Sequence, residues 1–490
     1  MHKNIMILGT ASSAGKSLIT TALCRVFHEE GLKVTPFKSQ NMSLNSYVTE
    51  EGLEMGRAQV VQAEAAGIKP KVFMNPLLLK PNSNNGSQVI FMGKALGNMK
   101  ASEYFEFKGK LKKEIEVIYE EIRKNFDICV IEGAGSPAEI NLNKDDIVNI
   151  GMAKIAKAPC ILVADIDRGG VFASIYGTIM LLNPEERKYI KGIIINKFRG
   201  DIKLLDSGLK MIEDLVNIPV LGVLPYFNHN IEEEDSASPE SFSKSGEGEI
   251  KVSAIKLPHM SNFNDFDPFK LQKNCTLEFV EEPKNLDPHI LIIPGSKNTI
   301  ADTIFLKNNG FFEKILELKE KGVLIIGICG GMQILGENIS DPYGIESNVS
   351  SIRGLGLLNI NTILEKEKTT KQYIGKTKAS FLNIESNFQV EGYEIHQGIS
   401  KGEGSLLESN GHDIAFAKDN VIGTYLHGIF DKGDFLVKIL EAVSKGNNLS
   451  FDEQNFKDIK EKEYRNLAKI FENSIDINKI KKIMEDNNDL

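Results

Sequence analysis

Residues 4–17, Asn-Ile-Met-Ile-Leu-Gly-Thr-Ala-Ser-Ser-Ala-Gly-Lys-Ser, decide the fold of the first half of the chain. The apolar run Asn4–Leu8 is typical of a buried strand, and an amphipathic helical pattern begins directly after the final serine. Small residues between the two let backbone N–H groups turn toward phosphate oxygens, and the helix adds the positive end of its dipole. This order of strand, glycine loop and helix therefore predicts an ATP site, with the nucleotide bound by Gly9, Thr10, Gly15, Lys16 and Ser17.

The spacing of this loop departs slightly from the common phosphate-binding form. Gly9 and Gly15 are six positions apart, which is one residue more than in the usual GxxxxGK pattern. Lys16 supplies the cation for the phosphates, and the hydroxyl of Ser17 is a predicted ligand of Mg²⁺.

Other short, β-branched runs in the first half alternate with longer amphipathic segments. Fully apolar strands separated by helices indicate a doubly wound parallel α/β sheet. The predicted strands are Lys33–Phe37, Ile128–Glu132, Cys160–Asp165 and Gly192–Asn196.

Polar residues stand where several of these strands end, and open α/β sheets bind ligands along that edge. Lys38 is predicted to stabilise either a transferring γ-phosphoryl group or the anion that receives it. Glu132 follows an apolar strand, where an enzyme of this kind places the carboxylate that orients its metal. Asn196 is predicted to contact the adenine edge, since an amide both donates and accepts.

The composition predicts a globular, cytoplasmic chain, and its length of 490 residues suggests roughly two to four domains. Of its 490 residues 41% are hydrophobic and 26% charged, and the net charge of −9 argues against broad nucleic-acid binding. Five cysteines without CxxC spacing suit a reducing cytosol, and no apolar stretch has the length of a membrane span. We expect a P-loop domain over 1–227, an exposed Ser/Glu-rich linker over 228–249, a second α/β domain over 250–440 and a helical tail over 441–490.

The second α/β domain is predicted to present a cysteine on a nucleophile elbow. The strand Val323–Ile328 ends at Cys329, which is followed by two glycines and a helical pattern. The glycines permit a sharp turn, and the helix N-terminus favours the thiolate form of Cys329. The other strands predicted here are Lys251–Ile255, Ile290–Ile293 and Val421–Tyr425.

A cysteine nucleophile needs a base and an oxyanion site. His427 follows a predicted strand and is the first candidate for the base, while His396 also follows a strand-like run and competes with it. A glycine loop at Gly295 is predicted to supply an oxyanion N–H group.

Together these motifs resemble two known families in a fixed order. The loop, Lys38 and Glu132-Gly133-Ala134-Gly135 resemble the dethiobiotin-synthetase type of P-loop domain, and Gly327–Gln333 resembles class I glutamine amidotransferases. The combination closely resembles the cobyric acid synthase family of cobalamin biosynthesis, through about residue 435. The most specific strings are Gln40–Ser46, Glu132–Glu139, Asp165–Ser174 and Ser261–Pro268.

The resemblance implies a glutamine- and ATP-dependent amidation of corrin carboxylates. In such an enzyme the b, d, e and g carboxylates of adenosylcobyrinic acid a,c-diamide would be amidated in succession. Cys329 would attack glutamine, His427 would shuttle the proton, and N–H groups of Gly295 and Gly330 would hold the oxyanion. Lys16, Ser17 and Glu132 would hold ATP–Mg²⁺. Asn41, Arg57 and Arg168 are the residues suspected of binding the corrinoid.

One departure from the amidotransferase pattern leaves the orientation of His427 open. Many class I members have His-x-Glu here, but His427 is followed by Gly428 and Ile429. Two alternatives remain: cobyrinic acid a,c-diamide synthase, and a P-loop ATPase switch of the chromosome-partitioning type. The switch leaves Cys329 unexplained, and the sequence does not fix the oligomeric state.

Overall fold

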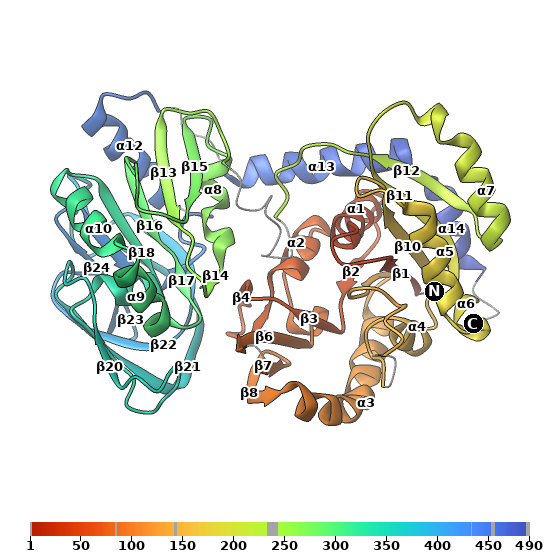
Figure 1. Ribbon diagram of the computed structural model, residues 1–490, viewed down its shortest axis with the longest axis horizontal. Coiled ribbons are helices and arrows are strands. Elements are labelled where there is room, and N and C mark those ends of the chain that lie inside the picture. The colour runs from red at the N-terminus through yellow and green to blue at the C-terminus, as the bar shows by residue number, and fades with distance from the viewer. Residues whose placement is uncertain are drawn as a thin grey trace. The chain divides into compact units, whose positions relative to one another are not determined.

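The computed structural model describes residues 2–83, 86–141, 145–232, 244–432, 434–451 and 456–486. The chain forms two compact units (Figure 1). The N-terminal unit comprises Met1–Ser43, Met55–Asp235 and Lys460–Leu490, and the C-terminal unit comprises Leu44–Glu54 and Ser236–Ile459. Both units therefore include residues outside the contiguous ranges expected from the sequence.

A six-stranded sheet forms the centre of the N-terminal unit, in the order β12-β11-β10-β1-β9-β2. Every neighbouring pair is parallel, which confirms the predicted doubly wound sheet. Its strands are β1 (Lys3–Gly9), β2 (Val34–Phe37), β9 (Ile128–Glu132), β10 (Cys160–Asp165), β11 (Ile190–Phe198) and β12 (Val220–Pro225).

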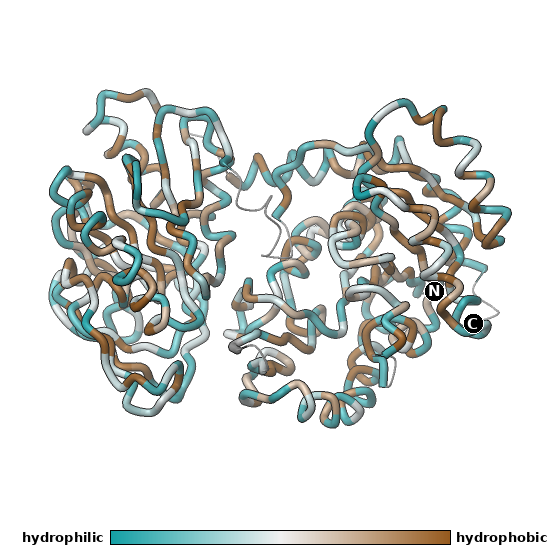
Figure 2. Tube along the Cα trace, viewed as in Figure 1, coloured by the Kyte–Doolittle hydropathy of each residue, from teal (hydrophilic) through white to brown (hydrophobic). Residues whose placement is uncertain are grey.

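Helices cover both faces of this sheet, and an apolar cluster lies on each face. In Figure 2 the strands of the sheet are largely brown, the colour of hydrophobic residues, and the helices carry both brown and teal residues. One layer includes residues of α3 (Ala101–Asn125), α4 (Ile150–Ala156), α5 (Val171–Leu181) and α7 (Asp206–Val216). The other includes residues of α1 (Lys16–Glu29), α2 (Arg57–Ala65), α13 (Phe456–Ser474) and α14 (Ile477–Glu485). The short helix α6 (Pro184–Arg187) follows α5.

The C-terminal helices α13 and α14 complete the second of these layers. Tyr464, Leu467 and Phe471 of α13 are buried against the sheet, as are Ile480 and Met484 of α14. Apolar spacing in the sequence predicts these faces, and the structure shows that they are part of the core of the N-terminal unit. No helix among the described residues is long and apolar enough to cross a membrane.

A second, four-stranded sheet in the N-terminal unit was not predicted from the sequence. It has the order β3-β6-β7-β8, with β3 (Gln40–Met42) parallel to β6 (Leu77–Ser83). The strands β7 (Gly86–Phe91) and β8 (Lys94–Lys100) complete it as an antiparallel meander. β3 begins only two residues after Lys38, so this second sheet starts near the carboxyl end of β2.

The expected exposed linker is wrong at its acidic start. Glu232 is buried and forms ion pairs with Arg57 and Lys460, at 2.6 and 2.8 Å. A carboxylate flanked by two cations can be buried at lower cost than one alone, which an acidic run in the sequence does not reveal. Residues 233–243 of the expected linker lie outside the described residues.

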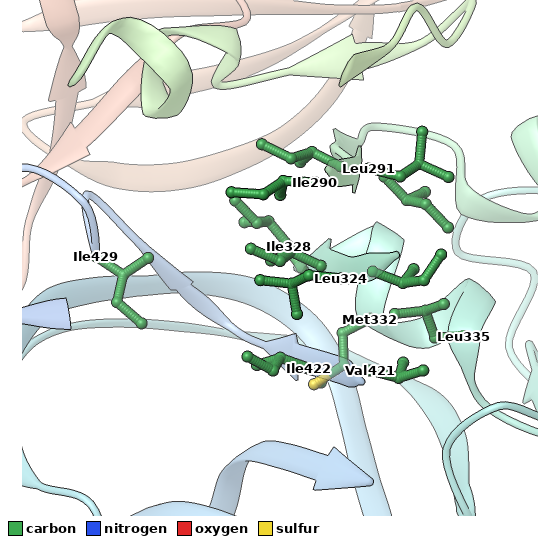
Figure 3. Packing of buried hydrophobic residues seen from close by; sticks show 14 of the residues in the cluster. Ile290, Leu291, Leu324, Ile328, Met332, Leu335, Val421, Ile422 and Ile429 are labelled. Carbon is green, nitrogen blue, oxygen red and sulfur yellow. The ribbon is translucent and has the colours of Figure 1, made fainter. Parts of the chain in front are cut away.

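A seven-stranded sheet forms the centre of the C-terminal unit, in the order β15-β13-β16-β18-β25-β24-β23. Figure 3 shows Ile290, Leu324, Ile328 and Val421 from three neighbouring strands, which pack with Met332 and Leu335 of helix α11 (Gly330–Leu335). The strands are β13 (Ile250–Ile255), β15 (Cys275–Val280), β16 (Ile290–Ile293), β18 (Leu324–Ile328), β23 (Ser405–Ser409), β24 (His412–Lys418) and β25 (Val421–Thr424).

A five-stranded sheet, in the order β20-β19-β21-β22-β26, adds a second layer to this unit. Its strands are β19 (Asn338–Ser340), β20 (Ser351–Arg353), β21 (Ile360–Lys376), β22 (Gln389–Gly402) and β26 (Leu426–His427). The remaining elements are β4 (Ser46–Val48), β5 (Glu54–Gly56), β14 (Met260–Ser261), β17 (Gly295–Ser296), α8 (Asp267–Lys270), α9 (Thr299–Asn308), α10 (Phe311–Glu320), α11 (Gly330–Leu335) and α12 (Phe435–Asn447).

Candidate functional site

The predicted nucleotide loop lies between β1 and α1, as its sequence requires. Gly15 adopts φ 102°, and a Cβ there would come within 1.9 Å of the Asn196 amide, so only glycine fits. The ammonium of Lys16 donates to the carbonyls of Ala11 and Gly135, at 3.0 and 3.1 Å. The N–H of Thr10 is already bonded to the carbonyl of Val163, so it is not available to the predicted phosphate.

Glu132 joins the end of β9 to the loop and to Lys38. One of its carboxylate oxygens accepts from the hydroxyl of Ser17 and from the ammonium of Lys38, both at 2.9 Å. Its other oxygen accepts from Gln62 at 2.5 Å, and the carboxylate is fully buried. The structure therefore brings together Lys16, Ser17, Lys38 and Glu132, which come from three separate stretches of sequence.

The same group of residues fits the ligand chemistry of Mg²⁺. This ion prefers oxygen ligands and usually takes only one or two from the protein, completing its shell with phosphates and water. The hydroxyl of Ser17 and the carboxylate of Glu132 are oxygens of this kind, and they are already adjacent. No group of three or more His, Cys, Asp or Glu side chains suited to a metal occurs within the described residues.

Asn196, at the end of β11, is bound to the nucleotide loop. Its amide nitrogen donates to the carbonyl of Ala14 at 3.0 Å, and its amide oxygen accepts from the N–H of Lys197 at 2.9 Å. Adenine contact stays a prediction for Asn196, and the amide nitrogen keeps a second hydrogen for it.

The three suspected corrinoid residues lie in different settings. Asn41, in β3, is buried and donates to Gln59 at 3.2 Å. Arg168 follows β10 at the carboxyl edge, and 68% of its side chain is exposed. Arg57 is buried, and its guanidinium donates to both oxygens of Glu232 at 2.6 and 2.9 Å. This paired arrangement does not favour Arg57 as a ligand for substrate carboxylates, because its charge is already compensated inside the fold.

Cys329 has the backbone geometry of a nucleophile elbow. It sits between β18 and α11 with φ 51° and ψ −106°, a conformation that L-residues rarely adopt. Directly behind it, a Cβ on Gly331 would lie 2.0 Å from the carbonyl of Ile293, so this tight turn requires glycine. Ile328 before the turn and Met332 after it belong to the packed core (Figure 3), and this packing holds the strained backbone of Cys329 in place.

His427 is buried beside Cys329 and is oriented by Asp265. The imidazole Nδ1 lies 2.6 Å from one carboxylate oxygen of Asp265, and the other oxygen accepts from the N–H of Gly428 at 2.8 Å. Burial alone lowers the pKa of His427, but the charge of Asp265, with hydrogen bonds to Asp265 and Cys329, raises it to about 10. An imidazolium held in this way stabilises a neighbouring thiolate.

Asp265 is the residue that sequence reasoning missed. It supplies the acid that is absent at the usual His-x-Glu position, but it stands in the short helical turn Phe263–Phe266. The signal was present, because the string Ser261–Pro268 is among the most specific of the resemblance. What the sequence lacked was a reason to pair that string with His427.

His396 is in a different setting from that of a catalytic base. Its Nδ1 is 2.8 Å from the carbonyl of Gly398, and its Nε2 is 2.9 Å from the carboxylate of Glu394. Its ring also stacks on Tyr425, with centroids 3.8 Å apart. Since acceptors engage both ring nitrogens, His427 is the better placed of the two candidates.

The predicted oxyanion loop lies against the elbow. A Cβ on Gly330 would be 3.0 Å from the N–H nitrogen of Ser296, and one on Gly295 would be 3.2 Å from the imidazole of His427. The hydroxyl of Ser296 donates to the buried Asp302 at 2.6 Å, which fixes this loop. Gly295 and Gly330 are thus brought together beside Cys329 and His427.

Comparisons with known proteins match both halves of the chain. The model of the CobQ/CobB/MinD/ParA nucleotide binding domain matches residues 5–239. The model of the CobB/CobQ-like glutamine amidotransferase domain matches residues 251–435.

Curated relatives match the chain over almost its full length. A cobyric acid synthase of Caldanaerobacter subterraneus subsp. tengcongensis is 50% identical, over 99% of this chain and 99% of that protein. A cobyric acid synthase of Clostridium novyi is 50% identical, over 99% of this chain and 98% of that protein. One from Lachnoclostridium phytofermentans is 49% identical, over 99% of this chain and all of that protein.

Proposed function

This chain belongs to the cobyric acid synthase family, glutamine-hydrolysing ligases of cobalamin biosynthesis, and we propose that it amidates the b, d, e and g carboxylates of adenosylcobyrinic acid a,c-diamide. The observation that best supports this proposal is the presence of two different reaction sites in one chain. One is the Cys329–His427–Asp265 constellation, and the other is the P-loop site with Lys38 and Glu132.

The C-terminal unit would release ammonia from glutamine. The Cys329 thiolate attacks the side-chain amide carbon, and N–H groups at Gly295 and Gly330 stabilise the resulting oxyanion. Because Asp265 engages Nδ1, the Nε2 of His427 donates the proton with which ammonia leaves. Water then hydrolyses the thioester to glutamate and restores the thiolate.

The N-terminal unit would use ATP to activate a corrin carboxylate. The carboxylate takes the γ-phosphoryl group and becomes an acyl phosphate, while ADP leaves. Lys16 and Lys38 stabilise the transferring charge. Mg²⁺, when bound by Ser17 and Glu132, neutralises charge on the phosphates. Ammonia then displaces phosphate from the acyl group and leaves the amide.

Several further expectations belong to this proposal. Asn196 would contact adenine, and Asn41 and Arg168 would contact the corrinoid. We expect a cytoplasmic enzyme of small molecules that acts on neither nucleic acid nor membrane. The alternative of a partitioning-type ATPase switch gains nothing from the structure, because such a switch has no use for the Cys329 elbow.

The experiment that tests the proposed substrate counts amides. Purified protein is incubated with ATP, Mg²⁺, the a,c-diamide corrinoid and glutamine labelled in its amide nitrogen, and the corrinoid product is analysed by mass spectrometry. We expect four labelled amide groups per corrinoid at completion. A corrinoid that gains no label would refute the proposed substrate. In a parallel incubation with cobyrinic acid in place of the a,c-diamide, labelling of cobyrinic acid alone would favour the a,c-diamide synthase.

A further inference from the structure

The main-chain groups of Ser46 are bonded to Asn262, which contacts Asp265, and to Tyr393, which stacks on His427. The N–H of Ser46 donates to the side-chain oxygen of Asn262 at 3.1 Å, and its carbonyl accepts from the phenol of Tyr393 at 2.9 Å. All three residues are buried, where a lost hydrogen bond costs more free energy than it does at an exposed position. The backbone of Ser46 thereby connects Asn262 to Tyr393.

Tyr393 packs against one face of the His427 ring. The two rings stack with centroids 5.8 Å apart and an interplanar angle of 28°. Tyr393 is also the antiparallel partner of His427 in the β22–β26 pair. Since the Tyr393 hydroxyl donates to the carbonyl of Ser46, this bond holds the tyrosine side chain in the position from which it stacks on the imidazole.

Asn262 forms a hydrogen bond with Asp265, the residue that orients His427. It adopts φ 51° and precedes the helical turn Phe263–Phe266. Its carbonyl accepts from the N–H of Asp265 at 3.0 Å, and Asp265 in turn holds the imidazole at 2.6 Å. A shift of Asn262 would therefore move the carboxylate that sets the ring orientation of His427.

The segment 44–54, which includes Ser46, lies in the N-terminal half of the sequence, far from Asn262 and Tyr393. It belongs to the C-terminal unit, yet the chain continues from both of its ends into the N-terminal unit. It is anchored in the C-terminal unit by a hydrogen bond of 2.8 Å from Thr370 to Gly52 and by the Lys368–Glu54 ion pair at 2.5 Å. Val48 also packs with Tyr393 and Ile395. Only a few residues separate Ser46 from Lys38 of the predicted ATP site.

We propose that segment 44–54 positions His427 through the peptide groups of Ser46, and so makes glutamine hydrolysis depend on the state of the amidation half of the chain. The inference rests on the proposed function, because it requires His427 to serve Cys329 as proton shuttle. Tyr393 and Asn262 are positioning residues, since both act through the imidazole and its carboxylate partner.

The first test removes one hydroxyl from this connection. Tyr393→Phe keeps the ring that stacks on His427 and deletes the hydroxyl that donates to Ser46. We expect kcat for glutamine hydrolysis to fall about tenfold or more, with KM for glutamine within about twofold, because misplaced catalytic groups lower the rate rather than binding. Amidation with ammonium in place of glutamine should be unchanged, and the pH profile of glutamine hydrolysis should shift.

A matched control is available in the neighbouring strand. Tyr373 of β21 is also buried, and Tyr373→Phe removes a hydroxyl outside the connection. We expect all rates of this variant to equal those of the unmodified protein. Asn262→Gly removes the other bond while permitting the positive φ, and Asn285→Gly, at φ 61°, is its control.

The second test measures the dependence between the two halves. Glutamate release is followed with and without ATP and the corrinoid. We expect stimulation by the two substrates in the unmodified protein, and a ratio close to one in Tyr393→Phe. An unstimulated native enzyme would overturn the inference, as would full stimulation with native kcat in Tyr393→Phe. Failure of the proposed function would differ, because glutamine hydrolysis would then survive Cys329→Ala.

Discussion

Asp265 and His427 stand 162 positions apart, yet the carboxylate lies 2.6 Å from the imidazole Nδ1, where it would serve as the acid of the proposed glutaminase constellation. The carboxylate leaves Nε2 to face the thiol and favours the imidazolium form. Its position before, rather than after, the histidine explains why the usual His-x-Glu pattern is absent.

Asp265→Asn tests this role directly. The amide keeps the shape of the side chain but no longer stabilises a charged ring or selects its tautomer. Loss of an orienting carboxylate in comparable triads costs about 10⁴ in kcat, and we expect a loss of about 10² to 10⁴ in glutamine hydrolysis, measured as glutamate release. Ammonium-dependent amidation should persist; a variant that keeps the native rate with glutamine would exclude Asp265 from catalysis.

The pH dependence of the free energy of unfolding also tests the interaction between Asp265 and His427. The pKa of His427 is raised from 6.5 to about 10, so the folded state binds its proton more tightly than the unfolded state. The stabilisation is fully present below about pH 6.5 and is lost as the pH rises toward 10. Urea unfolding of the native protein and of Asp265→Asn should show a difference that shrinks across this range. A difference that grows with pH would contradict the assignment.

Glu132→Gln tests the site in the N-terminal unit. The substitution removes the charge that pairs with Lys38 and the carboxylate oxygen beside Ser17. We expect amidation to fall by about 10² or more with glutamine and with ammonium alike, because charge stabilisation at a phosphoryl group is lost. Basal glutamine hydrolysis should remain measurable. Native amidation by this variant would argue against Glu132 as a metal ligand.

Glu232→Gln addresses stability rather than catalysis. Burial raises the pKa of Glu232, but Arg57 and Lys460 outweigh that effect and hold it well below its ordinary range. Removing one charge leaves a buried cation uncompensated, for which we expect a loss of about 3–5 kcal/mol in the unfolding transition of the N-terminal unit. Glu121→Gln, in an exposed pair with Lys124, is the control and should change the free energy by less than about 1 kcal/mol. Equal effects of both would refute the buried network.

Local sequence patterns predicted much of this protein. In the two main sheets, each strand that precedes a site residue is a short apolar run, and neighbouring parallel strands bring their carboxyl ends to one edge. Lys16, Lys38 and Glu132 could therefore be placed together without any knowledge of the packing. The strand, cysteine and glycine order likewise fixed the elbow at Cys329, because few other backbones permit it.

The features that the sequence did not predict depend on pairings between distant residues. Asp265 acts on His427, and Glu232 is buried between Arg57 and Lys460, through contacts with no fixed spacing along the chain. Segment 44–54 joins the unit formed mainly by the second half of the chain, whereas helices α13 and α14 return to the first. Hydrophobic periodicity predicts that a helix or strand has a buried face, but not which element covers it.

The central claim is that one chain hydrolyses glutamine at Cys329 and uses the ammonia for ATP-dependent amidation elsewhere. The most direct measurement compares Cys329→Ala supplied with glutamine and with ammonium, with amides on the corrinoid product counted by mass spectrometry. We predict no amidation from glutamine and undiminished amidation from ammonium at saturating concentration. Continued amidation from glutamine, or failure with both nitrogen sources in a folded variant, would contradict the account.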